Sequence, residues 1–113
     1  MLTDPRWDEE RRKELVVALL ENLRDPDEQV SQGAEGVLVS LNRDAVAALV
    51  GLVQGKDKRL RVKAAIILGQ MGTMGNRHQE AVAPLTAALK DEDKEVRKAA
   101  AYALSQILVQ PHP

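Results

Sequence analysis

Five basic side chains lie close together near the middle of the 113-residue chain. They are Lys56, Lys58, Arg59, Arg61 and Lys63. Such a cluster has the charge to bind an anion or a nucleic-acid backbone, and it can equally form ion pairs with acidic segments packed beside it. The cluster contains no aromatic residue that would stack on bases, which argues against binding of single-stranded nucleic acid.

The charge of the rest of the chain bears on this choice. Residues 1–42 contain 5 basic and 10 acidic residues, residues 43–79 contain 7 and 2, and residues 80–113 contain 4 and 5. The basic segment therefore lies between two acidic ones, and opposite charges on adjacent turns can fix the register of stacked segments. We favour ion pairing, with anion or nucleic-acid binding as the alternative. We expect Arg97 to reach the turn of Asp57 in the same way.

Other residues with chemical potential are few. The chain has no cysteine and two histidines, and it contains no motif of nucleophilic catalysis or of a phosphate-binding loop. A metal site needs three or four converging ligands. His78 and His112 alone do not indicate such a set. Gly72 and Gly75 are more consistent with a helix end and a turn than with a phosphate cradle. We therefore predict no catalytic residue, no metal and no cofactor, and we expect that the protein is not an enzyme.

The composition predicts that helices position these side chains. Hydrophobic residues make up 44% of the chain, yet it has one Trp, one Tyr and no Phe. The apolar weight lies in Ala, Leu and Val, which favours an all-α fold. The net charge is −1, and no apolar segment resembles a signal peptide or a membrane span. We expect a cytoplasmic protein with no membrane partner, and we do not expect nucleic acid as its partner.

An internal repeat organises the chain. Three segments align without gaps, Leu23–Leu41, Val53–Met71 and Leu89–Ile107. Apolar residues three, four and seven positions apart within each unit, interrupted by a short polar turn, predict three helical hairpins and thus six helices. We expect one domain over residues 1–113, with repeat one at 4–42, repeat two at 43–72, an inter-repeat loop at 72–79 and repeat three at 80–110.

Local signals set the helix boundaries and the core. Asp27, Asp57 and Asp93 occupy the same position before the second helix of each unit, where an aspartate caps the backbone. Asp4 and Pro5 predict the start of the first helix. Pro84 predicts that the first helix of repeat three starts late or kinks. In the second helices we expect the core to take five positions and their counterparts, which in the first unit are Val30, Ala34, Val37, Leu38 and Leu41.

The third unit carries a family signature. Its sequence LKDEDKEVRKAAAYAL resembles HEAT repeats, in particular the short bacterial and archaeal HEAT-like repeats named after phycobilisome lyases. The resemblance implies a short right-handed superhelix, an armadillo-like α solenoid, with about three hairpins. It also implies a scaffold that binds another protein through the concave face of the second helices. A role as accessory subunit of a chromophore lyase or another modifying enzyme is the alternative.

The second helices supply the candidate binding residues. Counting around each helix leaves Val39, Ile66, Lys98 and Tyr102 on the expected concave face. Ile66 and Tyr102 among small residues would suit a partner helix or an extended peptide. The alternative is that both simply pack between repeats.

The two ends of the chain differ in sequence. The first helix carries the charged run DEERRKE, which we interpret as a polar cap. We expect Trp7 to pack this helix against the second hairpin, with an exposed contact as the alternative. The last hairpin has few charges, so its outer side could form an interface with a second copy, with another protein or with the next repeat of a larger ancestral array. The residues that suggest this interface are Ala83, Thr86, Ala87, Ala101, Leu108 and Val109.

Overall fold

The computed structural model describes residues 8–74 and 78–109. These residues form six α-helices and one short 3-10 helix, with no strand in either range. The α-helices are α1 (Glu9–Leu23), α2 (Glu28–Leu41), α3 (Arg43–Val53), α4 (Lys58–Thr73), α5 (Val82–Ala88) and α6 (Lys94–Leu108), and the 3-10 helix η1 spans Gln79–Ala81. The predicted all-α fold is confirmed.

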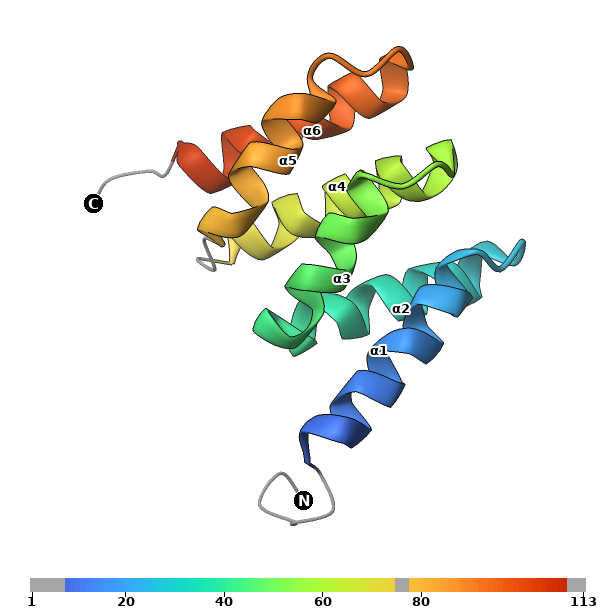
Figure 1. Ribbon diagram of the computed structural model, residues 1–113. Coiled ribbons are helices and arrows are strands. Elements are labelled where there is room, and N and C mark those ends of the chain that lie inside the picture. Colours follow the sequence, from blue (N-terminus) through green and yellow to red (C-terminus); the bar gives the residue numbers. More distant parts are fainter. Residues whose placement is uncertain (1–7, 75–77, 110–113) are drawn as a thin grey trace.

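Consecutive helices pair into three hairpins that stack side by side (Figure 1). Helices α1, α3 and α5 form one layer, and α2, α4 and α6 form the second layer. The three turns within the hairpins lie along one edge of the stack. One hairpin alone cannot bury its apolar side, so each depends on its neighbours, as in a solenoid. Each helix described here is too short or too polar to reach across a lipid bilayer.

The predicted aspartate caps are present in all three hairpins. The Asp27 carboxylate accepts the N–H of Gln29, that of Asp57 accepts the N–H of Leu60, and that of Asp93 accepts the N–H groups of Glu95 and Val96. Each cap satisfies backbone donors that the first helical turn leaves free, which contributes about 1 kcal/mol.

The predicted start of the first helix is wrong. Asp8, with an extended backbone, caps α1 by accepting the N–H of Arg11 at 3.0 Å, so the helix begins at Glu9. A second acidic residue four positions along thus takes the role expected of Asp4. The predicted residues Asp4, Pro5 and Trp7 lie outside the described residues, as do Gly75 and His112.

The third hairpin starts late, as Pro84 predicts. The chain passes through η1 before α5 begins at Val82, which places Pro84 in the first turn, where its missing N–H breaks no helical hydrogen bond. The expected loop at 72–79 is shorter than predicted, because α4 continues through Gly72 to Thr73. His78 is buried, and its Nε2 lies 2.6 Å from Oδ1 of Asn42, at the junction of α2 and α3.

The core follows the predicted repeat in α4 and α6 but not throughout α2. The counterparts of the five predicted positions are buried or packed against the core in both later helices, whereas Val30 and Val37 of α2 are 38% and 41% exposed. These two predictions are wrong because the side of α2 that holds Val30 and Val37 has no preceding repeat in the described chain. Val17 of α1 is also exposed, so the N-terminal end is not the uniformly polar cap that its charged run suggests.

Two glycines allow α4 and α6 to approach closely. A Cβ added at Gly69 would lie 2.6 Å from Cε2 of Tyr102 and 3.0 Å from Cα of Ala103. One added at Gly72 would lie 3.0 Å from Cγ1 of Ile107. Small residues therefore bring the backbones together at this junction, which explains how a core without phenylalanine stays closely packed.

Candidate functional site

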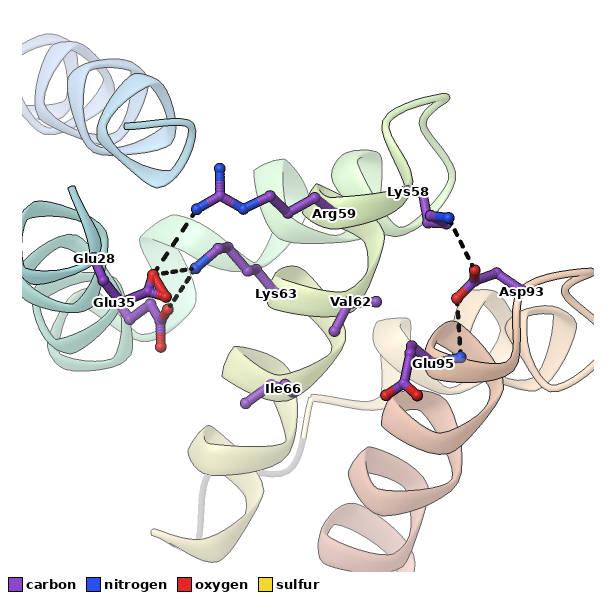
Figure 2. A pocket seen from close by; sticks show the side chains of 9 residues that line it. All are labelled: Glu28, Glu35, Lys58, Arg59, Val62, Lys63, Ile66, Asp93 and Glu95. Atoms are coloured by element: carbon purple, nitrogen blue, oxygen red, sulfur yellow. Dashed lines mark hydrogen bonds and ion pairs between the residues drawn. The ribbon is translucent and has the colours of Figure 1, made fainter. Parts of the chain in front are cut away.

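A groove lies between α2, α4 and α6 on the layer of second helices (Figure 2). It consists of a hollow of about 470 Å³ and a neighbouring hollow of about 330 Å³, which share Val62, Ile66 and Glu95. We call this continuous surface the even-helix groove. Its lining residues are Glu28, Glu35, Lys58, Arg59, Val62, Lys63, Ile66, Asp93, Glu95, Lys98, Ala99 and Tyr102.

The floor of the even-helix groove is apolar. Val62 and Ile66 lie one helical turn apart on α4, and Ala99 and Tyr102 continue the floor onto α6. Val62 and Ile66 are partly buried against the core, whereas Tyr102 remains 39% exposed. An apolar floor that is only partly covered can still bury area when a ligand binds.

One wall of the groove is an ion-pair network between α2 and α4. Nζ of Lys63 lies 2.8 Å from Oγ of Ser31 and 3.4 Å from a carboxylate oxygen of both Glu28 and Glu35. Only 12% of the Lys63 side chain is exposed, while Arg59 makes a longer contact of 3.9 Å with Glu28 at the surface. Figure 2 shows both basic side chains pointing from α4 toward α2. The ammonium group of Lys63 is therefore already neutralised.

The opposite wall joins α4 to α6. Nζ of Lys58 lies 3.3 Å from Oδ2 of Asp93, whose other oxygen caps α6. Desolvation alone would raise the pKa of Asp93, but the N–H donors of Val96 and Glu95 together with the Lys58 ammonium group lower it below its usual value. The carboxylate is thus held in its charged form.

The remaining two basic residues of the cluster lie outside the groove. Nε of Arg61 is 3.0 Å from Oδ2 of Asp91, and each of these side chains is only 14% exposed. The N–H at Nε makes no hydrogen bond, so this contact is an ion pair, while Nη2 donates to Oδ1 of Asp91 at 3.4 Å. Lys56 is exposed in the turn before α4 and does not line the groove.

The predicted contact of Arg97 is wrong. Its Nη1 donates to the carbonyl oxygens of Asp91 and Glu92 in its own turn, at 2.8 and 3.2 Å, and not to the turn of Asp57. Arg61 does the same, donating through Nη1 to the carbonyls of Gly55 and Lys56, both at 3.0 Å. The arginine at this repeat position therefore satisfies the carbonyls of its own turn first.

The structure brings three of the four predicted partner-binding residues together. Ile66, Lys98 and Tyr102 line the same hollow, whereas Val39 packs partly buried against the core and does not line the groove. Val39 aligns with Gly69 in the repeat, so it occupies the side of α2 that faces the next hairpin.

The acidic residues of the groove were not predicted from the sequence to belong to a site. Glu28, Glu35 and Glu95 line it because the stacking of hairpins brings α2 and α6 to either side of α4. The signal that could have found them is the alternation of acidic, basic and acidic segments. Among the same described residues, no three His, Asp or Glu side chains converge as a metal site would require.

The charges of the groove are largely paired with one another. Four carboxylates and four cations line it, and most of them already form ion pairs across its walls. A ligand would gain mainly by covering the apolar floor, with the walls limiting its orientation.

Comparison with known proteins agrees with the stacked hairpins. Residues 59–107 match the family model of the HEAT-like repeat, which confirms the resemblance seen in the sequence. The matched segment begins at the second residue of α4 and ends within α6. No curated protein matches the chain. HEAT-like repeats generally mediate protein–protein interaction.

Proposed function

We propose that this HEAT-like repeat protein is a non-catalytic scaffold that binds a segment of another protein in the even-helix groove. The groove lies on the layer of second helices, which the family resemblance assigns to the concave face. The proposal includes the cytoplasmic location expected from the sequence.

The partly covered floor carries this proposal. Val62, Ile66 and Tyr102 present apolar surface between walls whose charges are paired. Side chains of this kind in the centre of an interface, surrounded by polar residues, supply most of the binding energy in protein complexes. The partner segment should therefore be an amphipathic helix or an extended peptide with apolar anchors.

The charges of the groove predict how binding responds to salt. Equal numbers of cationic and anionic side chains line it, so long-range attraction for a charged partner is small. Binding that rests on the apolar floor should change little with ionic strength. Binding of an anion or nucleic acid to the basic cluster should instead weaken steeply as salt increases.

The test is selection of peptides from a displayed library on the wild-type protein, followed by affinity measurement on variants. Ile66→Glu places a charge on the floor and should weaken binding at least about tenfold, or 1.4 kcal/mol. Val17→Glu is the matched control, because Val17 is exposed on α1 away from the groove. Peptides that bind the Ile66→Glu variant as tightly as the wild type would contradict the proposal.

A second variant separates binding from packing. Tyr102→Ala should weaken peptide binding while the thermal midpoint of unfolding stays within a few degrees of the wild type. A large fall in that midpoint, with peptide affinity retained at low temperature, would show that Tyr102 serves only to pack α6 against Gly69 of α4.

Anion binding is the competing prediction for Lys56, Lys58, Arg59, Arg61 and Lys63. The ion pairs of Lys58, Arg59, Arg61 and Lys63 with carboxylates of α2 and of the turn before α6 support ion pairing between repeats instead. Affinity for a polyanion that falls with salt and with charge reversal at Arg59 would favour anion binding. The lyase-accessory role has the family resemblance alone as support, and co-purification with a tetrapyrrole protein would test it.

A further inference from the structure

The first hairpin exposes a helix face whose two valine positions are buried in the other two hairpins. This head face is the outer side of α2, and in it all side chains are exposed and uncharged. In α4 and α6 the counterparts of Val30 and Val37, namely Leu60, Ile67, Val96 and Ala103, are buried. A Cβ added at Gly33 or Gly36 would meet no atom within 4 Å in the described chain. The head face consists of Gln29, Val30, Gly33, Gly36, Val37 and Ser40.

The last hairpin exposes the complementary side. This tail face is the outer side of α6, formed by Ala101, Ser105 and Leu108, all of them exposed. Their counterparts in α4 are buried, and two of them are the glycines that receive α6. These counterparts are Ala65, Gly69 and Gly72. The tail face is therefore the surface with which a further hairpin would stack.

The junction of α4 and α6 shows which charges accompany such stacking. Arg61 and Lys58 in the first turn of α4 contact Asp91 and Asp93 in the turn before α6, at 3.0 and 3.3 Å. Arg61 is oriented for this contact because its Nη1 is bound to carbonyls of its own turn. This leaves the other side of the guanidinium group to face the next hairpin.

The last hairpin, which carries the tail face, repeats the basic side of this contact. Lys94 and Arg97 occupy the positions of Lys58 and Arg61 in the repeat, 36 residues later. Nη1 of Arg97 is bound to the carbonyls of its own turn, as in Arg61. Both Lys94 and Arg97 are exposed, and neither the Lys94 ammonium group nor Nε and Nη2 of Arg97 contacts a partner among the described residues.

The first hairpin, which carries the head face, repeats the acidic side of the contact. Asp25 and Asp27 occupy the positions of Asp91 and Asp93. Oδ1 of Asp25 accepts the N–H of Asp27 at 2.8 Å, and Oδ1 of Asp91 accepts the N–H of Asp93 at the same distance. The two aspartate pairs therefore have the same local geometry. The junction of α2 and α4 lacks the contact, because Ser31 and Gly55 replace the arginine and the first aspartate.

We propose that the tail of one molecule binds the head of a second copy, and so continues the stack of hairpins between molecules. Arg97 and Lys94 of one copy would contact Asp25 and Asp27 of the next. Inside the chain Gly69 receives Tyr102 and Ala103. The corresponding contact between copies would place Ser105 of the tail face against Gly36 and Val37 of the head face.

This contact uses two different surfaces, so it does not close on itself in a dimer. A heterologous contact continues from copy to copy and produces chains of increasing length. The turns at both ends also carry further carboxylates that repel one another, so we expect weak association with a Kd of about 10 µM to 1 mM. The wild-type protein should therefore increase in mass with concentration without stopping at a dimer.

Sedimentation analysis of two blocked variants tests the proposal. Val37→Arg blocks the head and Ser105→Arg blocks the tail, both at exposed positions where folding should survive, as circular dichroism would verify. Each variant alone should remain monomeric to about 1 mM, whereas an equal mixture should form a heterodimer and nothing larger, because one intact head and one intact tail remain. A head-blocked variant that still dimerises alone would overturn the proposal in favour of a symmetric contact through one face.

The charged contact is tested separately. The Arg97→Gln variant should associate about tenfold more weakly than the wild-type protein. The Lys90→Gln variant, changed at an exposed position in the same hairpin, should associate as the wild type does. Equal effects of the two changes would overturn the assigned contact. Wild-type protein that stays monomeric to about 1 mM would overturn self-association altogether and leave the two faces to a different protein. Ile66→Glu should leave association unchanged, so this test is independent of the groove.

Discussion

The two junctions between successive hairpins use the same repeat in different ways. At the junction of α4 and α6, glycines bring the backbones together and a shielded arginine–aspartate pair joins the turns. At the junction of α2 and α4, Lys63 fills the space between the helices and reaches Ser31, Glu28 and Glu35. The difference shows that hairpins of this chain can stack either by close backbone contact or around a polar side chain.

The comparison also ranks the hairpins by stability. Helix α4 packs between two neighbours, whereas α2 has a neighbour on one side only in the described residues. Stability in a solenoid is close to a sum over repeats and their interfaces, so a terminal hairpin opens at a lower free energy than a central one. The segment that matches the family model, residues 59–107, contains the glycine-mediated junction.

Removing the same leucine from each helix should give the largest effects. Leu68 of α4 and Leu38 of α2 occupy one repeat position and are 1% and 0% exposed. Substitution to alanine at such sites costs about 2–5 kcal/mol in the free energy of unfolding. We expect the higher value at Leu68, because neighbours on both sides limit collapse of the cavity. Urea denaturation followed by circular dichroism measures both, and a greater loss for Leu38→Ala would contradict the ranking.

Alanine at the glycines should distinguish the junction of α4 and α6 from the exposed face of α2 by the sign of the stability change. Gly69→Ala forces α6 away from α4 and should lower the free energy of unfolding by about 1–3 kcal/mol. Gly36→Ala meets no neighbour within 4 Å and should raise it by up to about 1 kcal/mol through helix propensity. The measurement is thermal and urea unfolding at dilute, monomeric concentration. Changes of the same sign would show that close approach at Gly69 is not required.

The ion pairs should differ in energy according to their exposure. Arg61→Met leaves Asp91 partly buried beside a lost partner and should cost about 1–3 kcal/mol of stability. Arg59→Met removes a pair whose side chains are 50% and 58% exposed, and it should cost less than about 0.5 kcal/mol. A double-mutant cycle of Arg61→Met with Asp91→Ala isolates the pair. A coupling energy near zero would assign the role of Arg61 to the carbonyls of its own turn.

The smallest expected effect depends on pH. The pKa of Asp93 is lowered in the folded state, so its charge stabilises the fold above the unfolded pKa of about 3.9, and this contribution is lost as pH falls through the lowered pKa. Asp93→Asn keeps an oxygen that can cap α6 but removes the charge. The variant should be slightly less stable than the wild type at pH 7, and the difference should shrink as pH falls through the lowered pKa, as measured by thermal unfolding. A difference that stays the same throughout the acid range would contradict this cause.

Repetition decided how much of the fold could be predicted from the sequence. The caps at Asp27, Asp57 and Asp93 could be predicted because three copies of one local signal occupy one position. The exposure of Val30 and Val37 could not be predicted in this way. Alignment with buried counterparts assumes that every hairpin has a neighbour on both sides. The prediction of where α1 starts was wrong for a local reason. Asp4 and Asp8 are both suitable residue types for a cap, and Asp8 caps the helix.

The candidate site was harder to predict than the fold. Periodicity placed Ile66, Lys98 and Tyr102 on one face, and stacking does bring them together. The position of Val39 and the acidic walls depend on the distance and rotation between hairpins, which a helical period does not contain. The predicted partner of Arg97 was wrong for a related reason. The carbonyls of its own turn compete with the carboxylate of a neighbouring turn for the guanidinium group.

The hydrogen bond between Asn42 and His78 joins the entrance of the middle hairpin to its exit. The contact joins two residues that are 36 positions apart, so the middle hairpin cannot open at either end without breaking it. Asn42, at φ 57°, and the buried His78 thus act as a clasp that couples the opening of α3 to that of the chain after α4.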